Sequence, residues 1–350
     1  MRRGDLIVSG VLGAALLLTG YGGSRQHRFT DGHAPTGLAA TKPHALWAIS
    51  AGTKGAAFSV SSHLRIRAPR GIVRGPDDAL WFTEPGNSIG RITTGGVIRI
   101  YRHRGIYHPE GIAAGADGAV WFTNLFGPTI GRITTAGNVR IYRNRGVFHP
   151  EGIAAGSDGA LWFTNSDGGA AIGRITRDGA IAIYRHPGMG DPEEITAGPD
   201  DALWFTNGDR GASIGRITTH GVITIYARSK VDEPEGIVAG RDGALWFTNG
   251  AHSIGRMTVN GAVTLYTRPA VDHPWGIAAG PDGGLWFTNP DRNSIGRITT
   301  KGVVSIYVHP GIEGPQGITV GPDGALWFTN HYGDSIGRIT TAGAVRIFRG

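Results

Sequence analysis

The run Trp81-Phe82-Thr83, followed by Ile89-Gly90-Arg91-Ile92-Thr93, decides the fold of this chain because the pair recurs seven times. The Trp-Phe-Thr runs begin at Trp81, Trp121, Trp162, Trp204, Trp246, Trp286 and Trp327. The Ile-Gly-Arg runs begin at Ile89, Ile130, Ile172, Ile214, Ile254, Ile295 and Ile336. The period is 40 to 42 residues. Self-similarity at that period is typical of a propeller or a solenoid.

One unit of the repeat, residues 109–149, contains four short segments typical of β-strands. Residues 112–114, 120–123, 130–134 and 139–142 are rich in β-branched and aromatic side chains, and Gly, Asn or Asp lies at their ends. The sequence therefore predicts an all-β fold, a β-propeller with seven regular four-stranded blades of about 40–42 residues each. Because blades stack face to face, we expect the recurring Trp, Phe, Ile and Tyr to fill the core and to carry no chemistry.

Composition narrows the function classes. The 59 Gly recur at fixed places between apolar segments, which indicates turns and not disorder. The chain has no Cys, so a disulfide, a thiol nucleophile and a thiolate metal site are excluded. The formal charge is +7, but seven of the Arg belong to the repeated Gly-Arg and are spread around the fold. We therefore expect no basic patch and no nucleic-acid partner.

Residues 1–20 have the form of an export signal. Arg2 and Arg3 precede an apolar stretch, 6–18, that is shorter than an ordinary membrane span. Tyr21 stands where a lipoprotein would have its lipidated Cys, so lipid anchoring is excluded. The signal is either cleaved or kept as a weak anchor, and both alternatives place the body in a secreted or extracytoplasmic location. Residues 21–34 are interpreted as a spacer.

Residues 35–67 form a degenerate copy of the repeat, ahead of the seven-bladed propeller expected over 69–350. The copy has the same spacing from Pro35 to Trp47 as a regular blade, but Pro69 follows Arg67 by only two positions. That is too short to cross a blade, so a regular fourth strand is not expected here. The unit is either an incomplete eighth blade or a segment packed outside a closed ring of seven.

The candidate site lies where the connections vary. The loop between the second and third strands of a unit changes in length, whereas the turns at the other end of the blades do not. Variable loops on a fixed scaffold usually carry function. At this end, the residue after each blade-opening Pro should line the mouth of the central channel. These residues are Arg70, Glu110, Glu151, Glu193, Glu235, Trp275 and Gln316.

Four adjacent blades thus present Glu at one height. Such a carboxylate ring could hold a divalent cation, and mutual repulsion would raise the pKa values of its members. The alternative is that Glu recurs because the repeat was duplicated, and that its side chain hydrogen-bonds only to local backbone.

Trp275 is the one Trp that is out of register with the core positions and with Trp47. It is either a stacking surface for a ring or sugar or a local packing residue. The second strands end in Asn, with Glu84 as the exception, which indicates turns or a polar ligand ring.

The unit Pro-x-Gly-Ile…Leu-Trp-Phe-Thr…Ile-Gly-Arg-Ile-Thr resembles the repeat of the virginiamycin B lyase (streptogramin B lyase) family over residues 69–349, with a weak extension to 35. The resemblance implies a seven-bladed propeller that opens the ester of a cyclic depsipeptide antibiotic by Mg-dependent elimination. In that family, His follows the opening Pro in two late blades, where this chain has Trp275 and Gln316. Gly314 and His331 stand where the family has Glu residues.

Two functions follow as hypotheses. One is a carbon-oxygen lyase that confers streptogramin resistance, with His273 and Glu235 as catalytic acid–base groups and Mg²⁺ at Glu235 and Glu193. The other is a non-catalytic module that binds a small molecule, peptide, glycan or envelope ligand. In either case the expected ligand-binding residues are Trp275, Gln316, His331, Glu110, Glu151 and Glu193. A monomer without a stable membrane span is expected, apart from an uncleaved signal.

Overall fold

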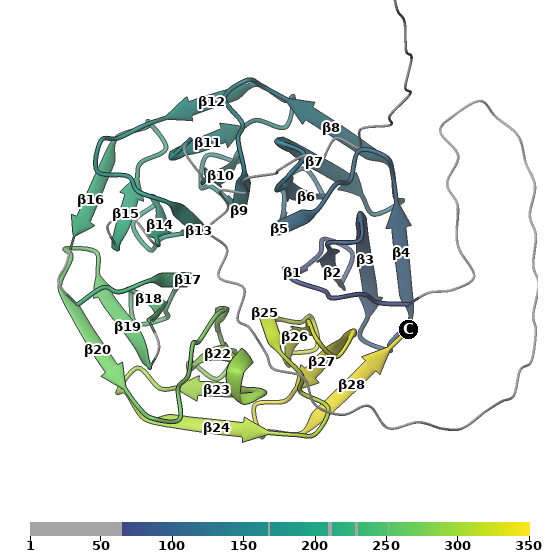
Figure 1. Ribbon diagram of the computed structural model, residues 1–350, viewed down its shortest axis with the longest axis vertical. Helices are drawn as coiled ribbons and strands as arrows, with labels where there is room; N and C mark the ends of the chain where they lie inside the picture. The colour runs from purple at the N-terminus through teal and green to yellow at the C-terminus, as the bar shows by residue number, and fades with distance from the viewer. Residues whose placement is uncertain (1–64, 167–168, 209–211, 228–229, 251) are drawn as a thin grey trace, which may run out of the picture. The chain divides into compact units, whose positions relative to one another are not determined.

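The computed structural model describes residues 65–350, except 167–168, 209–211, 228–229 and 251. Within these residues seven four-stranded antiparallel sheets form the blades of a seven-bladed β-propeller (Figure 1). Each blade consists of four consecutive strands, ordered from the channel to the outer edge. The predicted fold class is therefore confirmed. Most of the degenerate repeat, the spacer and the export signal lie outside the described residues.

The first four blades have the following strands. Blade 1 contains β1 (Ile72–Arg74), β2 (Ala79–Glu84), β3 (Ser88–Thr93) and β4 (Ile98–Arg102). Blade 2 contains β5 (Pro109–Ala114), β6 (Ala119–Asn124), β7 (Thr129–Thr134) and β8 (Val139–Arg143). Blade 3 contains β9 (Pro150–Ala155), β10 (Leu161–Asn165), β11 (Ala171–Ile175) and β12 (Ile181–Tyr184). Blade 4 contains β13 (Pro192–Ala197), β14 (Leu203–Asn207), β15 (Ser213–Ile217) and β16 (Ile223–Ala227).

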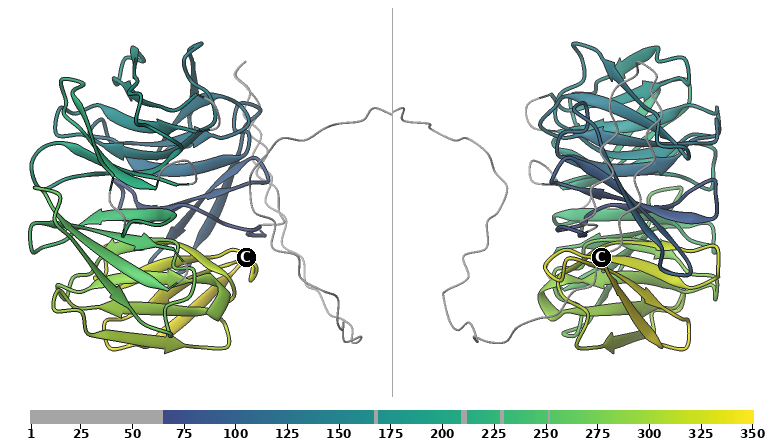
Figure 2. Two further views of the ribbon diagram at one scale, coloured as in Figure 1. Left: turned by 60° about the vertical axis from the view of Figure 1, so that its left-hand side comes forward. Right: turned by 90° about the vertical axis from the view of Figure 1, so that its right-hand side faces the viewer.

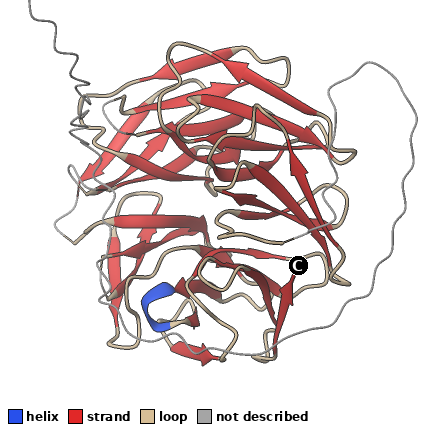
Figure 3. Ribbon diagram, turned by 45° about the vertical axis from the view of Figure 1, so that its right-hand side comes forward, coloured by secondary structure: helices blue, strands red, loops and turns tan. Residues whose placement is uncertain are grey.

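The last three blades follow the same plan. Blade 5 contains β17 (Pro234–Ala239), β18 (Ala244–Asn249), β19 (Ser253–Thr258) and β20 (Val263–Thr267). Blade 6 contains β21 (Ile277–Ala279), β22 (Leu285–Asn289), β23 (Ser294–Ile298) and β24 (Val304–Val308), with the 3-10 turn η1 (Pro290–Arg292) between β22 and β23. Blade 7 contains β25 (Pro315–Val320), β26 (Leu326–Asn330), β27 (Ser335–Ile339) and β28 (Val345–Arg349). In the described part of the chain, η1 is the only helical segment (Figure 3).

The core lies between blades. Every residue of β2 is buried, because this strand has neighbouring blades on both faces. Trp81 stacks on Tyr101 of its own blade with ring centroids 5.3 Å apart. The same Trp packs with Ile112 and Phe122 of blade 2. Equivalent clusters fill all seven inter-blade gaps. The recurring aromatic residues are therefore structural, as the sequence predicted.

The Gly of each Ile-Gly-Arg run makes room for the Phe of the neighbouring strand. In blade 1, Gly90 pairs with Phe82, and a Cβ on Gly90 would lie 2.0 Å from Phe82 Cζ. No side chain fits there unless the ring moves. This contact explains why glycine is repeated inside a β-strand, where it would otherwise be unfavourable.

The Arg of the same run completes a polar bridge. Asp77 accepts hydrogen bonds from Trp81 Nε1 at 2.9 Å and from Arg91 Nε at 2.7 Å. Partial burial alone would raise the pKa of Asp77, but these two bonds outweigh it and lower the pKa below its ordinary value. The equivalent Asp in each of the other six blades makes the same pair of bonds. Seven of the arginines therefore belong to the frame.

The ring closes without a shared strand. The Thr of each Trp-Phe-Thr run donates to the backbone of the next blade, and in blade 7 Thr329 Oγ1 donates to Arg70 O of blade 1 at 2.6 Å. Figure 2 shows the first blade, in dark blue, directly beside the last blade, in yellow. Ile66 is fully buried in the cluster between these two blades. Within the described residues, blade 7 therefore contacts blade 1 directly, with no further blade between them.

Candidate functional site

The residues that follow the blade-opening prolines line one cavity at the centre of the ring. Its volume is about 580 Å³, and its lining includes Arg70, Glu110, Glu151, Glu193, Glu235, Trp275 and Gln316. Each of these residues is held by its backbone. Thr123 Oγ1, for example, donates to Glu151 O at 2.6 Å. The structure therefore brings together six of the predicted site residues, and it places Trp275 on blade 6, across the ring from blades 2 and 3.

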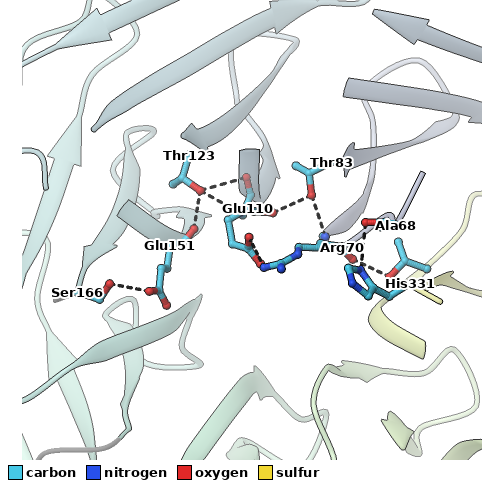
Figure 4. A network of polar contacts seen from close by, with 11 residues as sticks. Ala68, Arg70, Thr83, Glu110, Thr123, Glu151, Ser166 and His331 are labelled. Carbon is cyan, nitrogen blue, oxygen red and sulfur yellow. Dashed lines mark hydrogen bonds and ion pairs between the residues drawn. The ribbon is translucent and has the colours of Figure 1, made fainter. Parts of the chain in front are cut away.

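Arg70 and Glu110 form an ion pair at the blade 1 side of the cavity, with 2.7 Å between Arg70 Nη1 and Glu110 Oε2 (Figure 4). Arg70 Nε is buried and has no hydrogen-bond partner among the described residues. A buried donor without an acceptor is costly. A ligand oxygen in the cavity could satisfy it.

Glu151 is the next carboxyl along the ring. Its Oε1 accepts a hydrogen bond from Ser166 Oγ at 2.6 Å (Figure 4). Burial raises the pKa of Glu151 to about 8; the Ser166 bond opposes this rise, and the charges of Glu110, Asp191 and Glu235 add to it. The sequence predicted an upward shift from mutual repulsion, whereas burial is the larger cause here.

Glu193 and Glu235 lie on adjacent blades and interact directly. Burial is the main cause that raises the pKa of Glu193, and a hydrogen bond with the Glu235 side chain raises it further. Two carboxyl groups in contact cannot both ionise easily, so one proton is shared between them. The pair can exchange this proton for a cation.

Glu194 is a site residue that the sequence analysis missed. Six blades have Gly at this position in the innermost strand, and blade 4 alone has Glu. The Glu194 carboxylate lies against Gly152, where a Cβ would approach Oε2 to 2.6 Å. Burial raises the pKa of Glu194 to about 7 although its side chain still reaches the water of the channel. The signal was present in the sequence as Pro192-Glu193-Glu194 in place of Pro-x-Gly.

Trp275 supplies the apolar side of the cavity. Its backbone is fixed by Thr248 Oγ1, which donates to Trp275 O at 2.9 Å, and by Thr288 O, which accepts from Trp275 N at 3.1 Å. The side chain remains 43% exposed, unlike the seven fully buried core tryptophans of the blades. A fixed backbone with an exposed indole provides a stacking surface.

His273 and His331 do not line the cavity. His331 Nδ1 contacts Ala68 O at 3.1 Å, so the ring holds the segment that enters blade 1 (Figure 4). Burial and the nearby Arg70 charge lower the pKa of His331. His273 lies two residues before Trp275, where its Nδ1 is 3.2 Å from Asp272 Oδ1 and 3.1 Å from Asp291 Oδ2. These three residues could together hold a metal ion.

The Asn ring is structural. Asn124 Oδ1 accepts from Tyr107 N, and its Nδ2 donates to Gly105 O and to Thr129 Oγ1. It therefore clamps the connection that enters from the preceding blade. Glu84, the exception, accepts from Arg67 N at 2.8 Å and from Ser88 Oγ. Burial raises the pKa of Glu84, and these bonds oppose the rise.

The comparisons with known proteins agree with this geometry. The profile of the virginiamycin B lyase family matches residues 23–230 and 189–349. The chain belongs to the virginiamycin B lyase family. A streptogramin B lyase structure is 33% identical, with a TM-score of 0.73, and the match covers 83% of this chain and 97% of that one. No curated protein is similar enough to this chain to count as a match.

A second family structure is a catalytically inactive histidine-to-alanine variant of virginiamycin B lyase from Staphylococcus aureus, with quinupristin. It is 35% identical, with a TM-score of 0.73, and the match covers 81% of this chain and 97% of that one. Hydrazine synthase from Kuenenia stuttgartiensis is 15% identical with a TM-score of 0.68, over 84% of this chain and all of that one, and shares the fold alone. Family membership is thus established, and the activity is a separate question.

Proposed function

We propose that this member of the virginiamycin B lyase family binds a ligand at the channel mouth without carrying out the elimination of the family. The ligand would place a cationic group against the carboxyls and an apolar ring against Trp275. One observation carries the proposal: carboxyls on four consecutive blades share with an exposed indole a cavity of about 580 Å³. Sites for small molecules usually have volumes of about 300–1,000 Å³.

Charge favours a cation over an anion as the polar part of the ligand. The only cation of the channel-mouth ring, Arg70, is paired with Glu110. Near neutral pH, Glu151 and Glu193 hold protons because burial raises their pKa values. An incoming cation stabilises the ionised carboxyls, so binding should release protons.

The residues at the two expected histidine positions argue against the elimination. By the sequence resemblance, these positions hold Trp275 and Gln316. Neither an indole nor an amide can take up a proton near neutral pH. In the Staphylococcus aureus relative, replacement of a histidine by alanine gives a catalytically inactive protein.

The test is a titration of the purified protein with quinupristin at pH 7, by calorimetry in two buffers with different ionisation heats. Binding with proton release and no linear product by mass spectrometry would support the proposal. Trp275→Ala should weaken binding about tenfold, whereas Trp275→Phe should retain most of it. Phenethylamine, a cationic amine with an aromatic ring, is the second probe. If neither quinupristin nor phenethylamine binds, or if Trp275→Ala leaves the affinity unchanged, the proposal fails.

A Mg-dependent lyase is the second candidate, and the Asp272, His273 and Asp291 group favours it. One ligand atom from each lies within 4.8 Å of the others, next to Trp275. Mg²⁺ takes oxygen ligands, so the two Asp carboxylates fit it, although the second Asp272 oxygen accepts from Arg292. Bound Mg²⁺ would polarise an ester oxygen of the substrate. The Glu193 and Glu235 pair fits less well, because the ion must displace the shared proton.

In this candidate His273 and Glu235 are the groups that would move protons. Ring opening of quinupristin in the presence of Mg²⁺, lost in Asp291→Asn and in His273→Ala, would support the lyase. Linear product that persists in both variants would exclude this assignment of residues.

Export completes the proposed function. The proposed location is outside the cytoplasm, and this part of the proposal rests on residues 1–20 of the sequence. The proposed oligomeric state is a monomer. Among the residues that the structure describes, no helix is long and apolar enough to cross a bilayer. Fractionation of cells that produce the full chain, with detection of the body in the medium or envelope, tests this location.

A further inference from the structure

Arginines recur at two register positions of the outermost strand in three blades. In blade 1 the positions are Arg99, opposite Arg91, and Arg102, opposite Ser88. The equivalent pairs are Arg140 and Arg143 in blade 2, and Arg346 and Arg349 in blade 7. The same positions in the other blades hold Ala182 and Arg185, Thr224 and Ala227, Thr264 and Thr267, and Ser305 and Val308.

Ring closure makes these three blades neighbours. The strands β28, β4 and β8 follow one another along the outer edge of the ring (Figure 1). Residues 346–349, near the C-terminal end of the sequence, therefore join residues 99–143 along one side of the ring. The expectation of dispersed cations holds for the Gly-Arg arginines of the frame, and it fails for the outer arginines.

Four further arginines, all of them exposed, lie on the segments that enter or leave these blades: Arg65, Arg67, Arg104 and Arg145. We call all ten the arginine sector. Within the described residues, Arg349 alone among the ten forms an ion pair, with Glu313 at 3.5 Å. Arg140 and Arg346 lie over the rings of Tyr142 and Phe348, at 5.0 and 4.6 Å from the centroids, which orders their guanidinium groups.

Few acidic residues are available to neutralise the sector, apart from Glu313, which pairs with Arg349, and the buried Glu84, whose charge interacts with Arg102. Asp77, Asp117 and Asp323 are engaged in the Asp–Trp–Arg bridges of their own blades. Glu84 is buried, and Glu110 faces the channel. Of the acids in the blade connections, Asp232 and Asp291 lie on blades 4 to 6, whereas Glu313 and Asp334 belong to blade 7 and are two acids set against the ten arginines. The potential is therefore positive on one side of the ring.

We infer that the arginine sector binds an anionic polysaccharide. In a closed ring of seven blades each outer strand is turned by about 50° from the next. A flat bilayer or a stiff nucleic-acid duplex cannot contact three such strands at once, whereas a flexible chain can follow them. Single-stranded nucleic acid would need open rings between the charges. Tyr142 and Phe348 are buried beneath arginines, and the exposed Tyr107, Phe126 and Phe148 lie on loops and not on the outer strands.

The experiment compares two charge-matched triple variants with the full-length protein. Arg99→Gln, Arg104→Gln and Arg143→Gln remove three exposed cations from the sector. Arg241→Gln, Arg268→Gln and Lys301→Gln remove three exposed cations from blades 5 and 6. Each triple lowers the formal charge from +7 to +4. Thermal melting confirms that both fold.

The probes are polygalacturonate and its methyl ester, which keeps the sugar backbone and loses the charge. The unmodified protein should bind polygalacturonate at low salt and release it as salt rises. The sector triple should bind about tenfold or more weakly, with a salt dependence shallower by roughly two to three charges. The control triple should bind within about twofold of the unmodified protein.

Several outcomes would overturn the inference. These are no binding of polygalacturonate, equal losses in the two triples, or equal binding of the methyl ester. Tighter binding of oligothymidylate or of anionic vesicles, lost in the sector triple, would assign the surface to nucleic acid or membrane instead. None of these outcomes bears on the channel mouth, where Trp275 reports ligand binding.

Discussion

At the scale of single residues, burial is the main control of the channel-mouth acids. Glu151 accepts a hydrogen bond from Ser166, and burial raises its pKa to about 8. The same chemistry acts at Glu193 and Glu194. Because the pKa of each is raised, folding favours the protonated form, and the stability that these groups contribute is present below pH 4.5 and decreases as pH rises.

Glu151→Gln should therefore flatten the pH dependence of stability. In the unmodified protein the free energy of unfolding should fall between pH 4.5 and about pH 8 as Glu151 is forced to ionise. The variant cannot ionise and should lose part of this decline. Urea unfolding at pH 5 and pH 9 measures it. Asp178→Asn, at an exposed rim position, is the control and should leave the slope unchanged. Equal slopes in all three proteins would contradict the role of Glu151.

The sequence alone predicted the positions of these residues at the channel mouth, but not their protonation or their contacts. The position after each Pro was predictable, since a seven-fold repeat fixes the register. The burial of Glu151, the contact of Glu193 with Glu235 and the approach of Asp291 to His273 depend on side chains from different blades or loops. One sequence gives no distance between such groups. Glu194 was visible as a departure from the repeat, and it shows that such departures are informative.

At the scale of elements, the Asn clamps join each blade to the connection before it. Asn124 makes three hydrogen bonds, whereas Asn207 donates only to Ser213 Oγ, and its Oδ1 has no partner among the described residues. Blade 4 is therefore entered by a connection that the clamp does not hold.

This difference provides a matched pair of variants. Asn124→Ala should lower the free energy of unfolding by about 1–3 kcal/mol, because it leaves buried backbone groups without partners. Asn207→Ala removes one bond and should cost less. Denaturant unfolding at one pH measures both. A larger loss for Asn207→Ala would show that the clamp is not what stabilises the connection.

The glycine inside the third strand is a second element-scale constraint. Gly90→Ala brings a methyl group within about 2 Å of the Phe82 ring and should destabilise the protein by about 1–3 kcal/mol or more. Gly86→Ala is the control, because no atom lies within 4 Å of its added Cβ. If the two variants have the same melting temperature, the explanation of the repeated glycine by packing against Phe is wrong.

At the scale of the whole molecule, the fold was predictable because one packing solution recurs seven times. The closure of the ring was not predictable from the sequence. The seam between blades 7 and 1 depends on Ile66, which occupies the place that Ile106 occupies between blades 1 and 2. The adjacency of the outer arginines also appears only after the ring is closed.

Ile66→Ala should open the seam preferentially. Loss of this buried side chain should cost about 2–5 kcal/mol and speed amide exchange in β1 and β28 first. Ile106→Ala should cost a similar amount and should expose β4 and β6 instead. Hydrogen-exchange mass spectrometry distinguishes the two. Uniform exchange in both variants would show that the seam is no weaker than the other interfaces.

The absence of a shared strand at the seam has a consequence for the history of the chain. Each blade is encoded by one uninterrupted stretch, and the interface between the last blade and the first uses the same Thr-to-carbonyl contact as the other six. A gene that began one repeat later, and carried the displaced repeat at its end, would specify the same ring of blades. Whole repeats can therefore be duplicated, lost or reordered while every remaining interface stays matched.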